Sequence, residues 1–474
     1  MEEQNKQNLE SQECEANEEI NASKIKKTLP KKAIIAIIGV TVAVVALIAI
    51  LIILLGGKEN HSCIWSNIET LKNATCDDFG EEKWSCECGN YEIHSIAPAH
   101  NYAGDKCSVC KRTKPTEDLE YISNGDGTCK VTIKYDIKDT VTTLAIPDQS
   151  PSGERVTHID EFAFSNCSSL QSVVIPDSVT HIGKQAFYYL ETLEHLTLGN
   201  GISYIEDSAF DGVSLKTICI TDMKAWVDNE SLEDISYALE DADIIDANGN
   251  TIKEIIVPEG ITTIRHHAFA DTNISSVVIP NSVTTIEKYA FVNCDMLSNL
   301  TLGNDIKEIG ESAFSNCINL ESILIPDSVT SIGSSAFSHC NKLTSVEIPD
   351  SVTSLGSYAF SYCESLKVIR VGAKYISDSA FLECRYLQEV ILTDTVKVIS
   401  TDVFENCVRL YIVYFGKGLT DIKYGAFYNC NGLTLIYYSG TKTEWGYIIN
   451  NGLTGGSVLC EVPQPEYDIS DRYD

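Results

Sequence analysis

The chain has 474 residues, with 35 Lys and Arg against 67 Asp and Glu, so its formal net charge at pH 7 is −32. This excess of negative charge argues against nucleic acid and against anionic lipid as ligands. Attachment to a membrane would therefore have to come from an apolar segment rather than from charge.

The first 32 residues are predicted to form a disordered tail. Residues 1–23 are acidic and contain almost no large apolar side chains, so they cannot bury enough surface to fold. The remainder of the tail is basic and contains Lys24, Lys26, Lys27, Lys31 and Lys32.

Residues 33–55 carry no charge and are long enough to cross a bilayer as one helix. A cleaved signal peptide is the alternative, but the run is too long and lacks an obvious small-residue cleavage site. A cluster of five lysines lies directly before the run and Lys58 alone lies directly after it, so the positive-inside rule places residues 1–32 in the cytoplasm and residues 56–474 outside. We therefore expect a single-pass protein of the cell membrane with an extracellular C-terminal part.

Residues 56–117 are predicted to form a small cysteine-rich module. Cys86 with Cys88, and Cys107 with Cys110, have the spacing of two knuckles that give four thiolates to one structural zinc ion. Disulfides are the alternative, because the segment is expected outside the cell and its six cysteines pair evenly. A catalytic metal is not expected, since no activating carboxylate pattern accompanies these ligands. Zinc is the only cofactor that the sequence indicates.

The rest of the chain, to residue 460, follows a repeat of about 23 residues. Its most regular mark is a phenylalanine that recurs at Phe164, Phe187, Phe210, Phe269, Phe291, Phe314, Phe337, Phe360, Phe381, Phe404 and Phe427. A fixed period in this range is typical of a solenoid. The predicted fold is therefore a repeat solenoid, with a parallel β-sheet on one face and the transmembrane helix and cysteine-rich module before it.

One clear repeat unit begins at Leu320. Leu320, Ile323 and Ile325 have the L-x-x-L-x-L spacing of a leucine-rich repeat, and the alternation of the two isoleucines predicts a short strand with both side chains inward. Pro326 cannot donate to a ladder and ends the strand. One coil cannot bury its apolar residues alone, so stacked coils are expected to add their strands into one parallel sheet.

The pattern Ile-Pro-Asp-Ser-Val-Thr-x-Ile-Gly-x-x-Ala-Phe-x-x-Cys-x-x-Leu at 325–343 resembles the BspA-like leucine-rich-repeat family of microbial surface proteins. The resemblance covers roughly residues 118–460. It implies a protein-binding or adhesion module at the cell surface, with host matrix proteins or other cells as partners.

The array divides into four expected segments. Residues 118–220 are repeats that open with a hairpin, because Asn-Gly and Asp-Gly at 124–127 precede a β-branched run. Residues 221–250 are an inserted excursion, either a structural one or a protruding binding loop. Residues 251–460 are repeats with a C-terminal cap, and residues 461–474 are a polar tail expected to fray. Trp226 and Trp445 follow similar turns and predict one arrangement used twice, which interrupts the array at 226 and caps it at 445.

A cysteine lies three residues after eight of the repeat phenylalanines, and Leu190, Val213 and Thr272 replace it in the other three units. Replacement by leucine and valine indicates an apolar core position, so a ladder of buried thiols is expected. Disulfides between neighbouring coils are the alternative, because the strand spacing brings such residues within reach of each other.

The candidate ligand site is the outward face of the predicted sheet. The outward residue of each strand lies between the two inward ones, at Val174, Thr197, Cys219, Ile256, Val278, Thr301, Leu324, Glu347, Arg370, Ile391, Tyr414 and Tyr437. Strand propensity alone favours β-branched residues at such positions. A contiguous apolar strip instead marks an interaction site, and aromatic residues with arginine are typical of interface hot spots. We therefore assign the ligand to Leu324, Glu347, Arg370, Ile391, Tyr414 and Tyr437.

No catalytic motif is found, so an enzyme is not expected. The leading functional hypothesis is a membrane-anchored cell-surface module that binds proteins. The alternatives are a structural envelope protein that contacts the cell's own wall or a membrane partner, and a receptor-like sensor.

Overall fold

The computed structural model describes residues 115–453 and 456–465, together with the backbone of five short strands between residues 65 and 107. The predicted tail 1–32 and transmembrane run 33–55 lie outside the described residues, so both remain predictions. Among the helices of the described part, none has the length and apolar character to span a membrane.

The chain divides into two compact units, residues 1–103 with 108–110, and residues 104–107 with 111–474. The first contains an antiparallel sheet of β1 (Trp65–Lys72), β2 (Gly80–Cys86) and β3 (Tyr91–Ile96). Two short strands, β4 (Tyr102–Ala103) and β5 (Lys106–Cys107), pair with each other. Cys88 and Cys110 lie outside the described residues, so the choice between a zinc site and disulfides remains a prediction.

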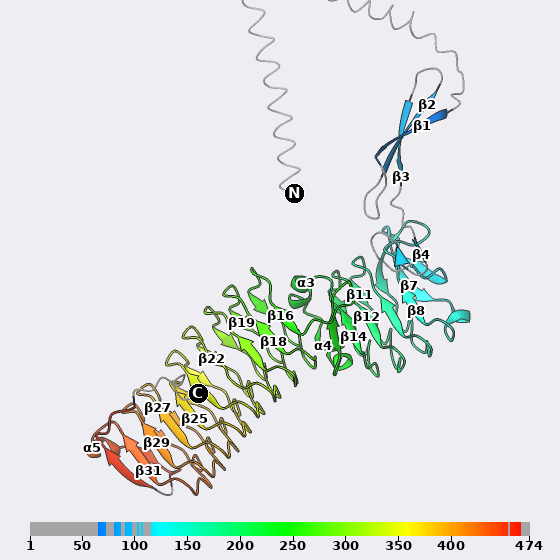
Figure 1. Ribbon diagram of the computed structural model, residues 1–474. Coiled ribbons are helices and arrows are strands. Elements are labelled where there is room, and N and C mark those ends of the chain that lie inside the picture. The colour runs from blue at the N-terminus through cyan, green and yellow to red at the C-terminus, as the bar shows by residue number, and fades with distance from the viewer. Residues whose placement is uncertain are drawn as a thin grey trace, which may run out of the picture. The chain divides into compact units, whose positions relative to one another are not determined.

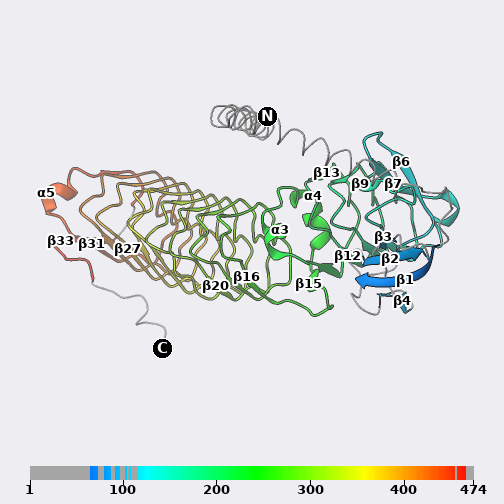
Figure 2. The ribbon, with the colours of Figure 1, turned by 90° about the horizontal axis from the view of Figure 1, so that it is seen from above.

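The second unit is a parallel β-solenoid of about 14 turns. Most coils carry one strand on each of two faces, called face A and face B, and Figures 1 and 2 show the coils stacked one after another. Face A carries β8 (Thr143–Ala145), β10 (Ser172–Val174), β12 (His195–Thr197), β14 (Thr217–Cys219), β15 (Asp243–Ile245), β16 (Glu254–Ile256), β18 (Ser276–Val278), β20 (Asn299–Thr301), β23 (Ser345–Ile348), β25 (Val368–Val371), β27 (Glu389–Leu392), β29 (Ile412–Phe415), β31 (Leu435–Tyr438) and β33 (Ser457–Cys460).

Face B carries β6 (Leu119–Ser123), β7 (Thr128–Ile133), β9 (Arg155–Ile159), β11 (His181–Ile182), β13 (Tyr204–Ile205), β17 (Thr263–Ile264), β19 (Thr285–Ile286), β21 (Glu308–Ile309), β22 (Ser331–Ile332), β24 (Ser354–Leu355), β26 (Tyr375–Ile376), β28 (Val398–Ile399), β30 (Asp421–Ile422) and β32 (Ile449–Asn450). The short helices are η1 (Tyr135–Ile137), α3 (Met223–Val227), α4 (Glu233–Ser236), η2 (Tyr237–Leu239) and α5 (Lys442–Trp445). The sequence predicted one sheet per coil, so face B is an addition made by the structure.

The repeat phenylalanines form the axis of the core. Their rings stack from coil to coil, as in Phe314 on Phe337 at 5.3 Å and Phe337 on Phe360 at 5.0 Å between centroids. A left-handed residue lies two positions before and two positions after the phenylalanine in most coils, such as Ser335 (φ 54°) and His339 (φ 59°). These two bends turn the chain around the ring and close the third side of the coil.

The strand predicted at Ile323 and Ile325 is absent, and this prediction is wrong. Residues 320–325 make no assigned ladder, so face A is divided between β20 and β23. The two isoleucines nevertheless point inward and are buried, while Leu324 between them points outward. Alternation of apolar residues decides which side faces the core, but it does not bring the backbone within hydrogen-bond distance of both neighbouring coils.

The predicted hairpin is confirmed at the start of the array. β6 and β7 pair antiparallel, from Leu119 opposite Ile133 to Ser123 opposite Cys129, and β7 then pairs with β9 in parallel. The hairpin therefore lies at the end of face B and covers its first edge.

The excursion 221–250 packs into the core rather than protruding. Trp226, Val227, Leu232, Ile235 and Leu239 are all buried in the hydrophobic cluster that continues through both parts of the array. Both faces are interrupted here, because β15 does not pair with β16 and β13 does not pair with β17. The excursion is structural: it links the two groups of coils through apolar packing and a single isolated bridge between Ala242 and Thr272, without a continuous strand ladder.

Candidate binding surface on face A

Face A places the predicted ligand residues in one row, one coil apart. Glu347, Arg370, Ile391, Tyr414 and Tyr437 are paired in register along β23, β25, β27, β29 and β31. Leu324 belongs to the preceding coil, in the segment without a ladder. The repeat period thus correctly gives the alignment of these residues, but their accessibility differs from one residue to the next.

Ile391 does not offer an exposed side chain, and that expectation is wrong. Its side chain is 1% exposed although it points away from the core, and the outward Glu389 of the same strand is 4% exposed. Ile412 on β29 is also buried. The outward side of β27 and β29 is therefore buried, which a repeat pattern within each coil does not reveal.

The two charged residues of the row form an ion pair with each other. Arg370 Nη1 donates to Glu347 Oε1 at 3.0 Å, and Arg370 Nη2 lies 3.9 Å from Asp350 Oδ1. The rings of Tyr414 and Tyr437 stack on neighbouring strands with their centroids 4.8 Å apart and are half-buried. At this end of face A the charged side chains therefore pair with each other, and the tyrosine rings are the main groups left to contact a ligand.

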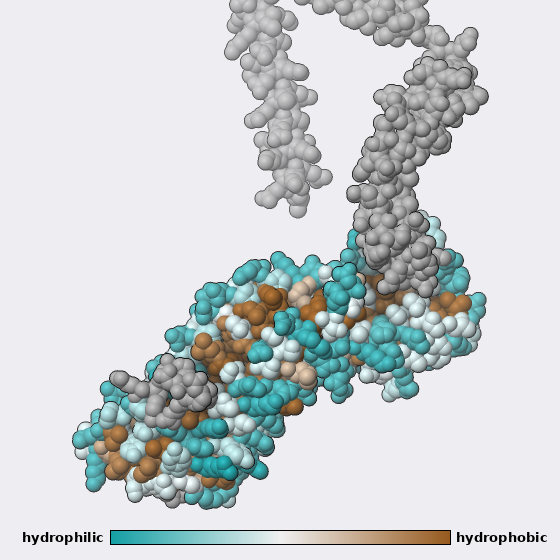
Figure 3. All heavy atoms as spheres, viewed as in Figure 1, coloured by the Kyte–Doolittle hydropathy of each residue, from teal (hydrophilic) through white to brown (hydrophobic). Residues whose placement is uncertain are grey.

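The middle of face A is more open and more apolar. Ile256 is 70% exposed, Val278 is 41% exposed and Leu324 is 80% exposed, although each lies on the outward side of its coil. The exposed Thr301 continues the row between Val278 and Leu324. Figure 3 shows apolar residues gathered over β16 and β18 on this face. We call Ile256, Val278 and Leu324 the apolar strip.

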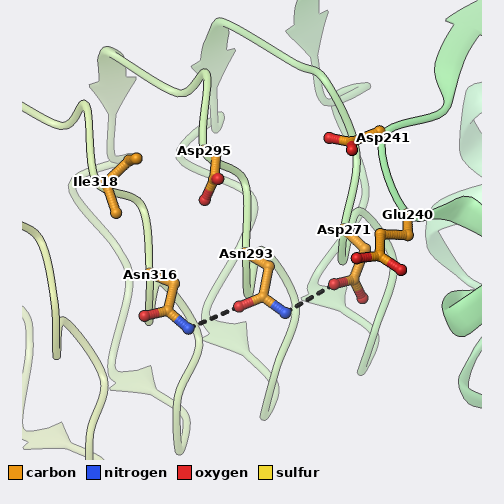
Figure 4. Close-up of a pocket in the computed structure, with 7 residues that line it drawn as sticks. All are labelled: Glu240, Asp241, Asp271, Asn293, Asp295, Asn316 and Ile318. Atoms are coloured by element: carbon orange, nitrogen blue, oxygen red, sulfur yellow. Dashed lines mark hydrogen bonds between the residues drawn. The ribbon is translucent and has the colours of Figure 1, made fainter.

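A polar pocket of about 370 Å³ lies on another side of the coils (Figure 4). Its walls are formed by Glu240, Asp241, Asp271, Asn293, Asp295, Asn316 and Ile318.

Part of this wall is a ladder of side chains from successive coils. Asn316 Nδ2 donates to Asn293 Oδ1 at 2.7 Å, and Asn293 Nδ2 donates to Asp271 Oδ1 at 2.7 Å. Burial raises the pKa of Asp271, the hydrogen bond from Asn293 opposes this shift, and nearby carboxylates led by Glu240 raise the pKa further. Across the described residues, no group of three or more His, Cys, Asp or Glu side chains is arranged to hold a metal ion.

The recurring cysteines are buried thiols, as predicted. They are free, and they are buried at Cys167, Cys294, Cys317, Cys340, Cys363, Cys384 and Cys407, whereas Cys430 is partly exposed. Each thiol in the second group of coils donates to the carbonyl of the phenylalanine one coil back, as Cys340 Sγ does to Phe314 O at 3.3 Å. Burial raises the pKa values of the fully buried thiols, to about 12 at Cys294 and Cys363. These thiols are core groups rather than nucleophiles.

Comparison with known proteins is consistent with the repeat geometry. The model of the BspA type Leucine rich repeat region matches six copies, over residues 149–241, 247–367 and 307–434. A leucine rich cell surface protein from Faecalibacterium prausnitzii is 25% identical, with a TM-score of 0.40 over 72% of this chain and 98% of that chain.

Two further solved structures are similar over most of their length. A leucine-rich repeat protein from Eubacterium ventriosum is 20% identical, with a TM-score of 0.42 over 74% of this chain and 95% of that chain. The pneumococcal vaccine antigen PcpA is 17% identical, with a TM-score of 0.40 over 85% of this chain and 100% of that chain. No curated protein matches the chain.

Proposed function

The chain belongs to the BspA-type leucine-rich-repeat family of surface proteins, and on this premise we propose that it binds protein ligands through the apolar strip of face A. The observation that carries the proposal is the exposure of Ile256, Val278 and Leu324 on one face of a rigid array. Leaving such side chains in water costs about 25 cal/mol per Å² of apolar surface, which a partner would recover by covering them.

The proposed site overlaps the sequence-based one at Leu324 and extends from there toward the N-terminal coils. The C-terminal end of the row is less suitable, because Ile391 is buried and Arg370 is already paired. The proposed ligands are proteins of the host matrix or of other cells, as the family resemblance implies. Binding without catalysis is expected.

The same proposal includes an anchored topology. Residues 33–55 would span the cell membrane, with residues 1–32 in the cytoplasm and the solenoid outside. The module at 56–117 would be held by a structural zinc on Cys86, Cys88, Cys107 and Cys110, or by disulfides. Protease treatment of intact cells and metal analysis of the purified chain test these two points, and loss of the repeats with retention of residues 1–32 is the expected digestion pattern.

The binding proposal is tested with the purified full chain against a panel of matrix proteins and isolated cell wall. Ile256→Ser combined with Leu324→Ser is expected to weaken saturable binding at least about tenfold, because hot-spot truncations commonly cost more than 1 kcal/mol. The matched control is Tyr204→Ser combined with Tyr375→Ser, which removes similarly exposed rings from face B and should leave binding unchanged.

Two outcomes would redirect the proposal. Binding that survives the strip variant but is lost with Tyr414→Ser and Tyr437→Ser would place the ligand at the C-terminal end of face A. Binding to wall material alone would favour the envelope role over adhesion.

A further inference from the structure

The burial of three neighbouring outward side chains on β27 and β29 calls for an explanation, because outward residues of the apolar strip on the same face are exposed. Glu389, Ile391 and Ile412 are buried, while Val278 and Leu324 on the same side of the array are exposed. The polypeptide alternates in the same way in both places, so alternation does not account for the difference, and the segment of chain after the last strand is the candidate for the cover.

The segment after β33 runs back toward this covered area. Glu461 adopts a left-handed conformation (φ 62°), and its amide donates to Gly440 O at 2.9 Å. The amide of Val462 then donates to Tyr438 O at the end of β31, at 3.2 Å. Two residues later, Gln464 Nε2 donates to Leu392 O at the end of β27, at 2.6 Å. The expectation of a frayed tail is therefore wrong for residues 461–465.

These contacts show the path of the chain after β33. Between Val462 and Gln464 the chain passes from β31 to β27, two strands back along face A, since β29 lies between them. Pro463 and Pro465 have no backbone N–H to pair in a ladder and favour an extended path, so this stretch crosses the strand ends instead of adding a strand.

The remaining nine residues, 466–474, have the reach and the chemistry to cover β27 and β29. Fully extended, they span up to about 30 Å, whereas neighbouring strands lie about 4.8 Å apart. Tyr467, Ile469 and Tyr473 supply apolar side chains that match Ile391 and Ile412. Arg472 is the single base of the segment and is opposite in charge to Glu389.

We propose that residues 461–474, the C-terminal segment, dock on the outward side of β27 and β29 and occupy this part of face A. The array therefore carries a surface that is covered by its own chain. An external ligand must use the uncovered apolar strip or displace the C-terminal segment. This inference stands independently of the binding function proposed above.

The test measures the accessibility of a reporter thiol in the full chain and in a chain that ends at Cys460. Ile391→Cys is introduced into both, and its maleimide labelling is followed by peptide mass spectrometry. Truncation is expected to speed the labelling of position 391 at least about tenfold. Leu324→Cys, which is exposed in the structure, is the matched control and should label equally fast in both chains. A synthetic peptide of residues 461–474 should restore protection at position 391.

The native Cys340 monitors unfolding in the same experiment, because it is fully buried in the core. If truncation also exposes Cys340, the truncated chain is replaced by a full-length triple variant, Tyr467→Asp, Ile469→Asp and Tyr473→Asp. This variant is expected to speed the labelling of position 391 while Cys340 stays protected. Equal labelling of position 391 with and without an intact C-terminal segment would overturn the proposal. No ligand is needed for this measurement, so its failure is distinguishable from failure of the binding proposal.

Discussion

The coils from Phe269 to Phe427 and the junction between Phe210 and Phe269 build the same core in two different ways. In the coils, each ring stacks on the next with centroids between 5.0 and 5.6 Å apart. At the junction, the described rings provide no stack from Phe210 to Phe269, and Trp226 lies there instead, with its Nε1 donating to Ala268 O at 2.6 Å.

The comparison shows that a solenoid can lose its period locally if the apolar core remains continuous. At the junction the strand ladders of face A and face B both stop. Val227, Leu232 and Leu239 nevertheless belong to the hydrophobic cluster that continues across it. An ion pair adds to the link, because Arg265 of the second group of coils contacts Glu230 of the excursion at 3.0 Å. The coils depend on identical neighbours, whereas the junction depends on a few individual residues.

The largest expected contrast is the response to alkaline pH. The folded coils hold thiols such as Cys317, Cys340 and Cys384 protonated, because burial raises their pKa well above its usual value. The unfolded chain loses these protons near pH 8.5, so each thiol should lower the unfolding free energy by about 1.4 kcal/mol per pH unit above that.

We expect the second group of coils, which contains most of the thiols, to unfold first as pH rises from 8 to 10. Denaturant titrations at several pH values check this, with a variant carrying Cys317→Val and Cys340→Val as the comparison. An unchanged pH slope in that variant would contradict the explanation.

The second contrast concerns a ring in the middle of the ladder. Phe337→Ala removes a buried ring that stacks on Phe314 and Phe360, so a loss of roughly 3–5 kcal/mol of unfolding free energy is expected. Denaturant unfolding followed by circular dichroism measures it. Phe162→Ala is the control: that ring is half-exposed, and its removal should cost about 0.5 kcal/mol or less.

The junction should respond differently to a smaller change. Trp226→Phe keeps an aromatic ring but leaves Ala268 O without its indole donor, which is expected to cost about 1–3 kcal/mol. Because no ladder crosses the junction, calorimetry should resolve two transitions in this variant where the natural chain shows one. Trp445→Phe, at the end of the array, tests the specificity of the effect. Splitting by both variants would show that the junction is not the weak link.

The smallest expected effect is a gain in stability. Asp271 has a raised pKa in the fold, so its charge is unfavourable at neutral pH, and the penalty disappears once both states are protonated, below about pH 4. Asp271→Asn keeps an acceptor for Asn293 and is expected to raise the unfolding free energy at pH 7 by roughly 0.5 kcal/mol, after allowance for solvent screening. Melting temperatures at pH 7 and pH 4 check this, and a lower value at pH 7 would refute it.

The sequence by itself determined the solenoid, the inward residues and the opening hairpin. These follow from local patterns: the phenylalanine recurs at a fixed step, and Asn-Gly and Asp-Gly fix the turn between β6 and β7. The exchange of cysteine with Leu190 and Val213 likewise identified a core position that the structure confirms at Cys340.

Only the tertiary structure decided which outward residues are accessible. Leu324 and Ile391 occupy equivalent places in their repeats, yet the first is exposed and the second is buried. The contact that distinguishes the region of Ile391 joins Gln464 to Leu392, 72 residues apart in the chain. A repeat pattern predicts how each coil packs against its neighbours, but it does not predict that a segment distant in the sequence crosses the surface of the folded array.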